Sequence, residues 1–148
     1  MDIDEFMKNN SVKSKKNVMK WVDEGLIPGT KVSKDGELIF SKYARAPYTA
    51  TRAKTTGAIY KSIIKGCYQR KGVCAKLYGI PEEEFDIYIE YAQQEQLIEV
   101  KTDGNCKFYF ATPKCEEFLK KPKIPSALID IISSIAIKGA TELLNKDM

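Results

Sequence analysis

The chain contains no histidine, and this absence removes the side chain that most often acts as a general base or completes a mixed zinc site. It also lacks a glycine-rich phosphate loop, a nucleophile elbow and a pair of carboxylates in an apolar setting. We therefore expect a protein that is not an enzyme and that needs no cofactor.

Cysteine is scarce, and its positions do not have the spacing of a metal site. Cys67, Cys74, Cys106 and Cys115 are widely separated and form no Cys-x-x-Cys pair. We expect no bound metal. The cysteines are better explained as small apolar side chains in a reducing compartment.

Long apolar runs are absent as well. No stretch approaches the roughly 18 residues that a membrane-spanning helix needs. The first residues, MDIDEFMKNN, are acidic where a signal peptide would be basic and then apolar. We expect a cytoplasmic protein without membrane association, and 148 residues allow one ordinary domain or two small ones.

The net charge of +4 is distributed unevenly. Residues 1–56 hold eleven Lys or Arg against seven Asp or Glu, whereas the remainder is balanced. No acidic residue occurs between Glu37 and Glu82. A basic stretch without acids fits a polyanionic partner; the alternative is a solvated surface whose counter-charges come from elsewhere in the fold.

The N-terminal residues predict two short helices that meet at a turn near residues 9–12. The first helix has Ile3, Phe6 and Met7 at helical spacing, and the second follows Ser14, a good N-cap, and stops before Gly25. The second helix buries one face, formed by Val18, Trp21 and Val22. The opposite arc is basic and polar, with Lys13, Lys16, Asn17 and Lys20.

A hairpin follows these two helices. The segment GLIPG turns the chain, and TKVSKDGELIF reads as two short strands around Asp35-Gly36, a dipeptide that favours turns with positive φ. This order of elements, together with FSKYARAP after it, resembles the MerR-like and excisionase-like winged helix-turn-helix DNA-binding domains over about residues 2–47, and we expect a first domain of residues 1–47.

The resemblance implies that the second helix enters the major groove of duplex DNA and that the hairpin, or wing, contacts the backbone. The implied DNA-binding residues of the helix and its start are Lys13, Lys15, Lys16, Asn17 and Lys20. Those of the wing and the segment after it are Lys31, Lys34, Lys42 and Arg45. We add Arg52 and Lys54 from the basic linker that we expect over residues 48–57.

Residues 58–121 predict three helices, a hairpin and a closing helix. This order repeats the helices-then-wing architecture of the first unit and resembles the general winged-helix superfamily. The exposed face of the third helix is acidic, with Glu83, Asp86 and Glu90, so it should not enter a DNA groove. Ile87 and Tyr91 on that face indicate a contact with a protein partner. The alternative is that C-terminal elements of this chain cover them.

Residues 122–148 begin with a break at Pro122 and Pro125 and then predict a helix with a wide apolar stripe. We expect this helix to join two copies of the chain, and its candidate contact residues are Leu128, Ile132, Ile135 and Leu143. Two alternatives stay open: the helix folds back as core, or it lies on a membrane as an amphipathic anchor.

The sequence thus predicts a mainly α chain with small β-hairpin wings, arranged as tandem winged helix-turn-helix domains with a C-terminal helix. The expected function is sequence-specific binding of double-stranded DNA by a homodimeric, nucleoid-associated transcriptional regulator of bacterial or mobile-element type. One alternative is an excisionase-like or replication-accessory architectural factor that bends DNA. Another is a protein-interaction adaptor that does not bind DNA.

Overall fold

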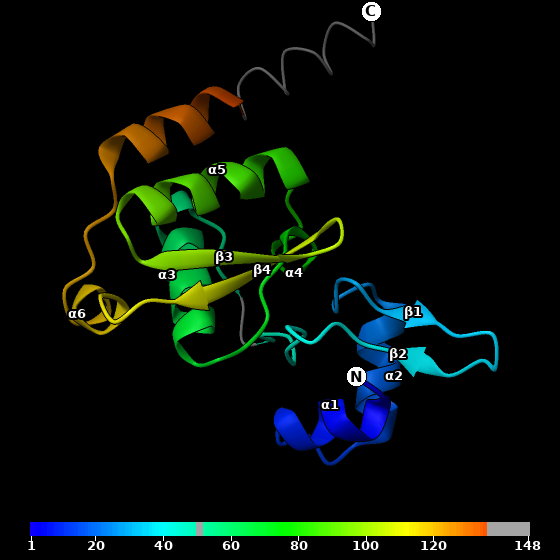
Figure 1. Ribbon diagram of the computed structural model, residues 1–148. Helices are drawn as coiled ribbons and strands as arrows, with labels where there is room; N and C mark the ends of the chain where they lie inside the picture. Colours follow the sequence, from blue (N-terminus) through cyan, green and yellow to red (C-terminus); the bar gives the residue numbers. More distant parts are fainter. Residues whose placement is uncertain (50–51, 136–148) are drawn as a thin grey trace, which may run out of the picture.

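The structure is a computed structural model that describes residues 1–49 and 52–135 (Figure 1). This part of the chain is mainly helical with two small antiparallel hairpins, as the sequence predicts. In order, the elements are α1 (Ile3–Asn9), α2 (Lys15–Asp23), β1 (Lys31–Val32), β2 (Leu38–Ile39), α3 (Thr56–Tyr68), α4 (Ala75–Tyr78), α5 (Glu82–Gln94), β3 (Ile98–Asp103), β4 (Cys106–Ala111) and α6 (Cys115–Lys120). A further helix occupies residues 126–135.

The boundaries of α2 follow from local signals. The hydroxyl of Ser14 accepts a hydrogen bond from the backbone N–H of Asn17 at 3.2 Å, which confirms the predicted N-cap. The helix ends at Asp23, and Gly25 has a φ of 71°, a left-handed conformation that glycine adopts without strain.

The hairpin β1–β2 is short and turns where the sequence predicts. Lys31 pairs with Ile39 and Val32 with Leu38. Gly36 has a φ of 81°, and the N–H of Ser33 donates to the carbonyl of Glu37 at 2.8 Å across the loop. A loop of three residues with a left-handed glycine at its end is a common hairpin connection.

The larger of the two apolar cores, called here the main core, is built on α3, α5 and the hairpin β3–β4. The predicted inner face of α5 is confirmed, because Phe85, Tyr88, Ile89 and Ala92 are buried in it. In Figure 1, α5 lies between the β3–β4 hairpin and the helix of residues 126–135. That last helix contributes Leu128 and Ile132 to the same core.

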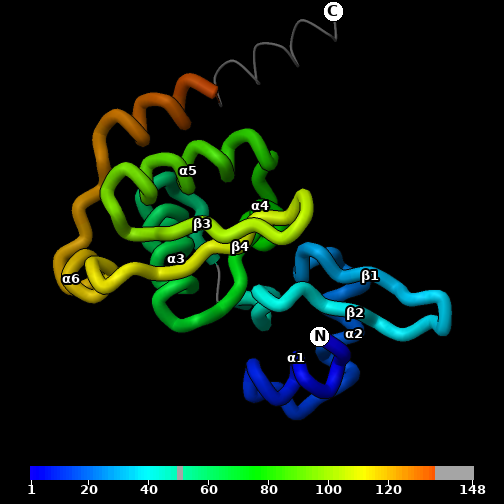
Figure 2. The backbone as a smooth tube through the Cα atoms, viewed as in Figure 1, coloured from blue at the N-terminus to red at the C-terminus, as the bar shows by residue number. Residues whose placement is uncertain are grey.

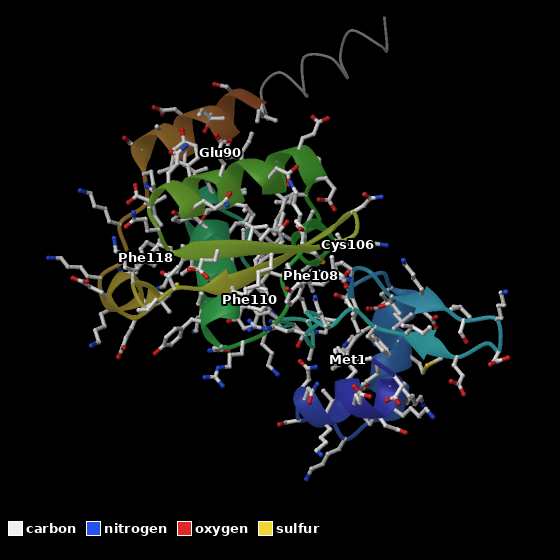
Figure 3. The ribbon with its side chains drawn as sticks, viewed as in Figure 1. Met1, Glu90, Cys106, Phe108, Phe110 and Phe118 are labelled. Atoms are coloured by element: carbon white, nitrogen blue, oxygen red, sulfur yellow. The ribbon has the colours of Figure 1, made fainter. Side chains whose placement is uncertain are left out.

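A smaller core, the N-terminal core, contains Phe6, Val18, Ile27, Phe40 and Ala44, and its sixth buried member is Phe108 from β4. Strand β4 therefore packs on both of its faces, while Glu99, Lys101 and Asp103 of β3 stay exposed. Tyr109 faces the main core, with its ring centre 5.5 Å from that of Phe85. Phe108 and Phe110, on the alternate positions, pack against the N-terminal core (Figure 3).

The segment of residues 41–48 fastens the two cores together; Figure 2 traces it in cyan from β2 toward the green part of the chain. The hydroxyl of Ser41 donates to Asp103 at 2.6 Å. Farther along, Tyr48 donates its N–H to the carbonyl of Gly72, and Gly72 donates to Ala46, both at 2.8 Å. Tyr48, the first residue of the expected linker, is buried in the main core. The last two residues of that linker, Thr56 and Gly57, belong to α3.

We expect Gly66→Ala to destabilise the protein, although alanine normally favours a helix by about 1 kcal/mol over glycine. A Cβ at Gly66 would lie 2.8 Å from Val73 Cγ1 and 2.9 Å from Tyr48 Cδ2, so two core side chains would have to move. Gly57→Ala in the same helix is the control, because its Cβ would meet a single atom, of Ile124, at 3.5 Å. Thermal unfolding followed by circular dichroism should give a lower Tm for Gly66→Ala alone; equal Tm values would contradict the close packing at Gly66.

Candidate nucleic-acid interface

The second helix, α2, presents the predicted division between an apolar and a basic face. Val18 is fully buried in the N-terminal core, and Trp21 and Val22 pack against it. Lys16, Asn17 and Lys20 are exposed on the other side. The first turn of α2 contains no acidic residue. The helix thus directs an amide and two ammonium groups to solvent, the donors that contact phosphates and base edges.

Three features modify this face. Lys13 is exposed but precedes the N-cap, so it lies beside the helix and not on it. Lys20 lies 4.0 Å from Glu24 in an exposed ion pair, an interaction worth only a few tenths of a kcal/mol. Lys15 and Met19 line a groove of about 400 Å³, which they share with Asp2, Asp4, Glu37 and the apolar side chains of Ile3 and Leu38.

The hairpin β1–β2 carries its two predicted lysines in the open. Lys31 and Lys34 are exposed, and in Figure 1 the loop between the strands projects away from the rest of the chain. Two apolar side chains accompany them, because Val32 is 68% exposed and Ile39 is 47% exposed. The hairpin therefore presents both ammonium groups and apolar side chains to solvent.

Lys42 and Arg45 follow the hairpin and lie at the junction of the two cores. Lys42 Nζ lies 5.1 Å from the ring centre of Tyr43, and the guanidinium of Arg45 lies 4.1 Å from that of Phe110. Burial lowers the pKa of Arg45, and the positive charge of nearby Arg70 acts in the same direction. Arg52 and Lys54, predicted farther along, are exposed before α3.

The sequence analysis missed an aromatic and basic cluster at this junction. Tyr43 and Phe110 form an edge-to-face pair with ring centres 5.8 Å apart, and Lys101 Nζ lies 4.8 Å from the centre of Phe110. Arg70 completes the cluster from the end of α3. No sequence signal joined Arg70 to these rings: it follows the C-cap of α3 with a φ of 59°, at a position where glycine is most frequent.

The protein-contact residues predicted on α5 are less accessible than expected. Ile87 and Tyr91 are half-buried and pack against the main core, which the helix of residues 126–135 helps to form. The alternative, that elements of this chain cover them, therefore describes them better. Glu83, Asp86 and Glu90 are exposed, as predicted, and keep this face acidic.

The C-terminal contact residues divide into different environments. Leu128 and Ile132 are buried in the main core, so their side chains are not free to join two copies of the chain, and here the core alternative holds. Ile135 is exposed, as are Ile129 and Ile131 on the same helix. Leu143 lies outside the described residues.

The cysteines and carboxylates of the described residues do not gather into one cluster. These residues contain no group of three or more Cys, Asp or Glu side chains that could hold a metal ion. All four cysteines are free thiols. Burial raises the pKa of Cys67 to about 12, so at neutral pH it is a protonated, unreactive core residue.

Comparison with known proteins leaves the family open. No family model, no curated protein and no solved structure matches the chain. Within residues 1–49 and 52–135, no helix has both the length and the apolar character needed to cross a bilayer. The function must therefore be argued from the residues and their geometry.

Proposed function

We propose that this chain binds double-stranded DNA sequence-specifically, with α2 in the major groove and the hairpin β1–β2 on the adjacent backbone, as a transcriptional regulator of bacterial or mobile-element type. The observation that carries the proposal is the exposed face of Lys16, Asn17 and Lys20 directly opposite the buried Val18. A short helix held by its apolar side, with a hairpin that carries two exposed lysines next to it in the chain, is the layout of a winged helix-turn-helix domain.

The proposal extends to the second half of the chain as a second winged-helix domain whose wing packs against the first unit. In its hairpin β3–β4, Phe108 is buried in the N-terminal core and Tyr109 packs on the main core, while the loop of residues 103–105 is exposed. Its third helix, α5, has an acidic exposed face that would repel phosphates. This half would therefore orient the DNA-binding unit and leave DNA contact to α2 and β1–β2.

The proposal also includes a homodimer formed through the C-terminal helix. The exposed side chains available for it in the described part are Ile129, Ile131 and Ile135, which are 41%, 39% and 37% exposed. Ile131 and Ile135 are four positions apart on one side of this helix and form an apolar surface that a second copy would cover, while Ile129 lies on the other flank of the buried face. Two linked subunits would bind two DNA half-sites with a high effective concentration.

The double substitution Lys16→Ala, Lys20→Ala tests the recognition helix. We expect duplex DNA affinity to fall by more than about 2 kcal/mol, roughly 30-fold, because phosphate or base contacts are lost. The slope of log K against log salt should also become shallower by about two. Both are measured by fluorescence anisotropy with a labelled duplex chosen by selection from a random pool.

The matched control is Lys120→Ala, Lys121→Ala, which removes the same charge from an exposed site on the second half of the chain. Lys120 lies 3.8 Å from Glu116, so it has the same kind of ion pair as Lys20. The control should bind DNA almost as the parent does. Equal losses in both variants would mean that general charge, not α2, determines affinity, and no loss in either would remove α2 from the interface.

The acidic face of α5 provides an independent prediction. Glu83→Gln, Glu90→Gln should leave DNA affinity unchanged or raise it slightly, because the substitution removes negative charge from a face that does not touch DNA. The same anisotropy assay measures this, with unfolding curves to verify the fold. A marked loss of affinity with unchanged stability would assign α5 a DNA contact.

An adaptor function is the second candidate, and a specific observation favours it. The groove beside Lys15 and Met19 is lined by Asp2, Asp4 and Glu37 as well as by apolar side chains. Carboxylates repel DNA, while a mixed groove of this kind fits a basic, partly apolar peptide. Binding to random duplex separates the two: an adaptor would show no salt-dependent DNA binding.

A further inference from the structure

A cavity of about 240 Å³ lies where the N-terminal core meets the second half of the chain. Its walls come from the end of α1, from the segment after β2, from the residue after the α3 cap and from β4. They include Asn10, Lys42, Tyr43, Arg45, Arg70 and Phe110. Three of these side chains are cationic and none of the residues lining the cavity is acidic. The lysines of α2 do not line it, so the cavity is separate from the proposed recognition face.

Arg45 packs against an aromatic ring in this wall but is not fully paired. Its guanidinium lies 4.1 Å from the ring centre of Phe110, so its plane is supported from one side. Its Nη1 is buried and has no hydrogen-bond partner in the described part of the chain. A buried donor without a partner costs free energy, and arginine cannot relieve the cost by losing its proton.

Arg70 adds a second unpaired positive charge. The ion pairs present among residues 1–49 and 52–135 include neither Arg45 nor Arg70. The two arginines are close enough for the charge of Arg70 to disfavour the charged form of Arg45. Like charges held together without a counter-ion are destabilising, and an anion bound between the two arginines would remove this repulsion.

The wall is fixed by hydrogen bonds that do not involve the cations. Asn10 donates through Nδ2 to the carbonyl of Phe6 at 2.9 Å and accepts from the N–H of Ala46 at 3.0 Å. These bonds tie the end of α1 to the segment that carries Arg45. A site that is preformed in this way loses little entropy when it binds a ligand.

We propose that this cavity is a phosphate-binding site in which Arg45 and Arg70 clamp the anion and Lys42 adds a third charge. A guanidinium offers a planar pair of N–H donors that match phosphate oxygens, whereas surface lysines act as point charges. The volume is several times the roughly 30 Å³ that a water molecule occupies in the liquid, so a phosphate group fits. The half-exposed ring of Tyr43 provides a surface for an attached base. The site does not depend on the proposed role of α2.

The first experiment uses inorganic phosphate with the full chain. We expect phosphate to raise the Tm relative to chloride at equal ionic strength and to shift the amide resonances of Asn10, Arg45 and Arg70. Arg45→Gln and Arg70→Gln should each weaken phosphate binding by about tenfold or more. Lys61→Gln, which removes an exposed charge from α3 away from the cavity, should bind phosphate as the parent does.

Arg70 is exposed at the surface, so Arg70→Gln should fold. This variant therefore tests the site even where Arg45→Gln does not fold. Arg45→Lys, which keeps the charge but loses the fork of donors, should bind with intermediate affinity. The proposal is overturned by an absence of phosphate-dependent shifts in the parent, or by shifts that persist unchanged in Arg70→Gln.

Further arms of the experiment identify the source of the phosphate. Thymidine 5′-monophosphate, a single-stranded oligothymidylate and a random duplex are titrated into the parent and into Arg70→Gln. If the parent binds the mononucleotide about tenfold more tightly than Arg70→Gln does, the site is assigned to a free nucleotide. If the affinities of the parent and Arg70→Gln differ only for the oligonucleotides, the site is assigned to the backbone of nucleic acid. Comparing the duplex with the oligothymidylate then distinguishes paired from single strands. If the parent and Arg70→Gln bind every one of these ligands, and inorganic phosphate, with equal affinity, the site is rejected.

Discussion

Phe108→Ala is expected to lower the free energy of unfolding by about 3–5 kcal/mol, the usual cost of deleting a buried aromatic side chain. Phe108 is 7% exposed and is the contribution of β4 to the N-terminal core. Its ring centre lies 6.0 Å from that of Tyr43, and its Cζ would touch a Cβ added at Gly29. The substitution therefore leaves a cavity between two parts of the chain and weakens both the core and their connection.

The single tryptophan of the chain makes this effect local and measurable. Trp21 packs against the N-terminal core, so its fluorescence reports the unfolding of that part, while circular dichroism at 222 nm reports all helices. In urea, the parent should show coincident transitions by both probes, because Phe108 couples the two cores. In Phe108→Ala, the fluorescence transition should move to lower urea than the dichroism transition.

Two controls separate this effect from a general loss of aromatic area. Tyr68→Ala removes a ring that is 46% exposed and should change stability little, within about 0.5 kcal/mol. Phe108→Leu keeps most of the apolar volume and should cost less than Phe108→Ala. Stability of Phe108→Ala equal to that of the parent would mean that the N-terminal core is complete without the hairpin β3–β4.

The sequence predicted well those features that depend on neighbouring residues. The Ser14 cap, the stop at Gly25 and the turn at Gly36 each require a particular backbone conformation or a hydrogen bond within a few residues. The same holds for the buried face of α5, where Phe85 and Tyr88 lie at helical spacing. Local chemistry determines these elements whatever the tertiary arrangement is.

The junction of the two cores could not be predicted in the same way, because its contacts join residues far apart in the sequence. The run CKFYFA has aromatic residues on both faces of the strand, and this pattern indicates burial on both sides. It does not indicate that Phe108 and Phe110 meet Tyr43. Lys42 and Arg45 were likewise assigned by their position after a wing, whereas the structure places them beside these rings.

The apolar C-terminal stripe shows a related difficulty. A helix with isoleucine and leucine on more than one face has enough apolar surface for its own core, for a partner or for both, and spacing alone does not separate these uses. The structure divides the stripe: Leu128 and Ile132 point into the main core, while Ile131 and Ile135 remain exposed. The packing of this helix on the main core, which the sequence alone does not reveal, makes the division.

This division predicts a large loss of stability for one substitution on this helix and a small loss for another. Leu128→Ala should lower the free energy of unfolding by about 2–5 kcal/mol, because the Leu128 side chain is 0% exposed in the main core. Ile131→Ala removes a similar apolar volume from a side chain that is 39% exposed, and it should cost less than about 1 kcal/mol. Urea unfolding followed by circular dichroism measures both values.

The exposed isoleucines, which contribute little to stability, should matter most for self-association in the proposed homodimer. Ile131→Glu, Ile135→Glu should leave the monomer folded, since both side chains are exposed, but should weaken the dimer by placing charges in its apolar contact. Sedimentation velocity of the parent and of this variant at micromolar concentration measures the effect. A parent that sediments as a monomer, or a variant that stays dimeric, would leave residues 126–135 with a structural role in the main core, and the dimer contact would have to be sought on another surface.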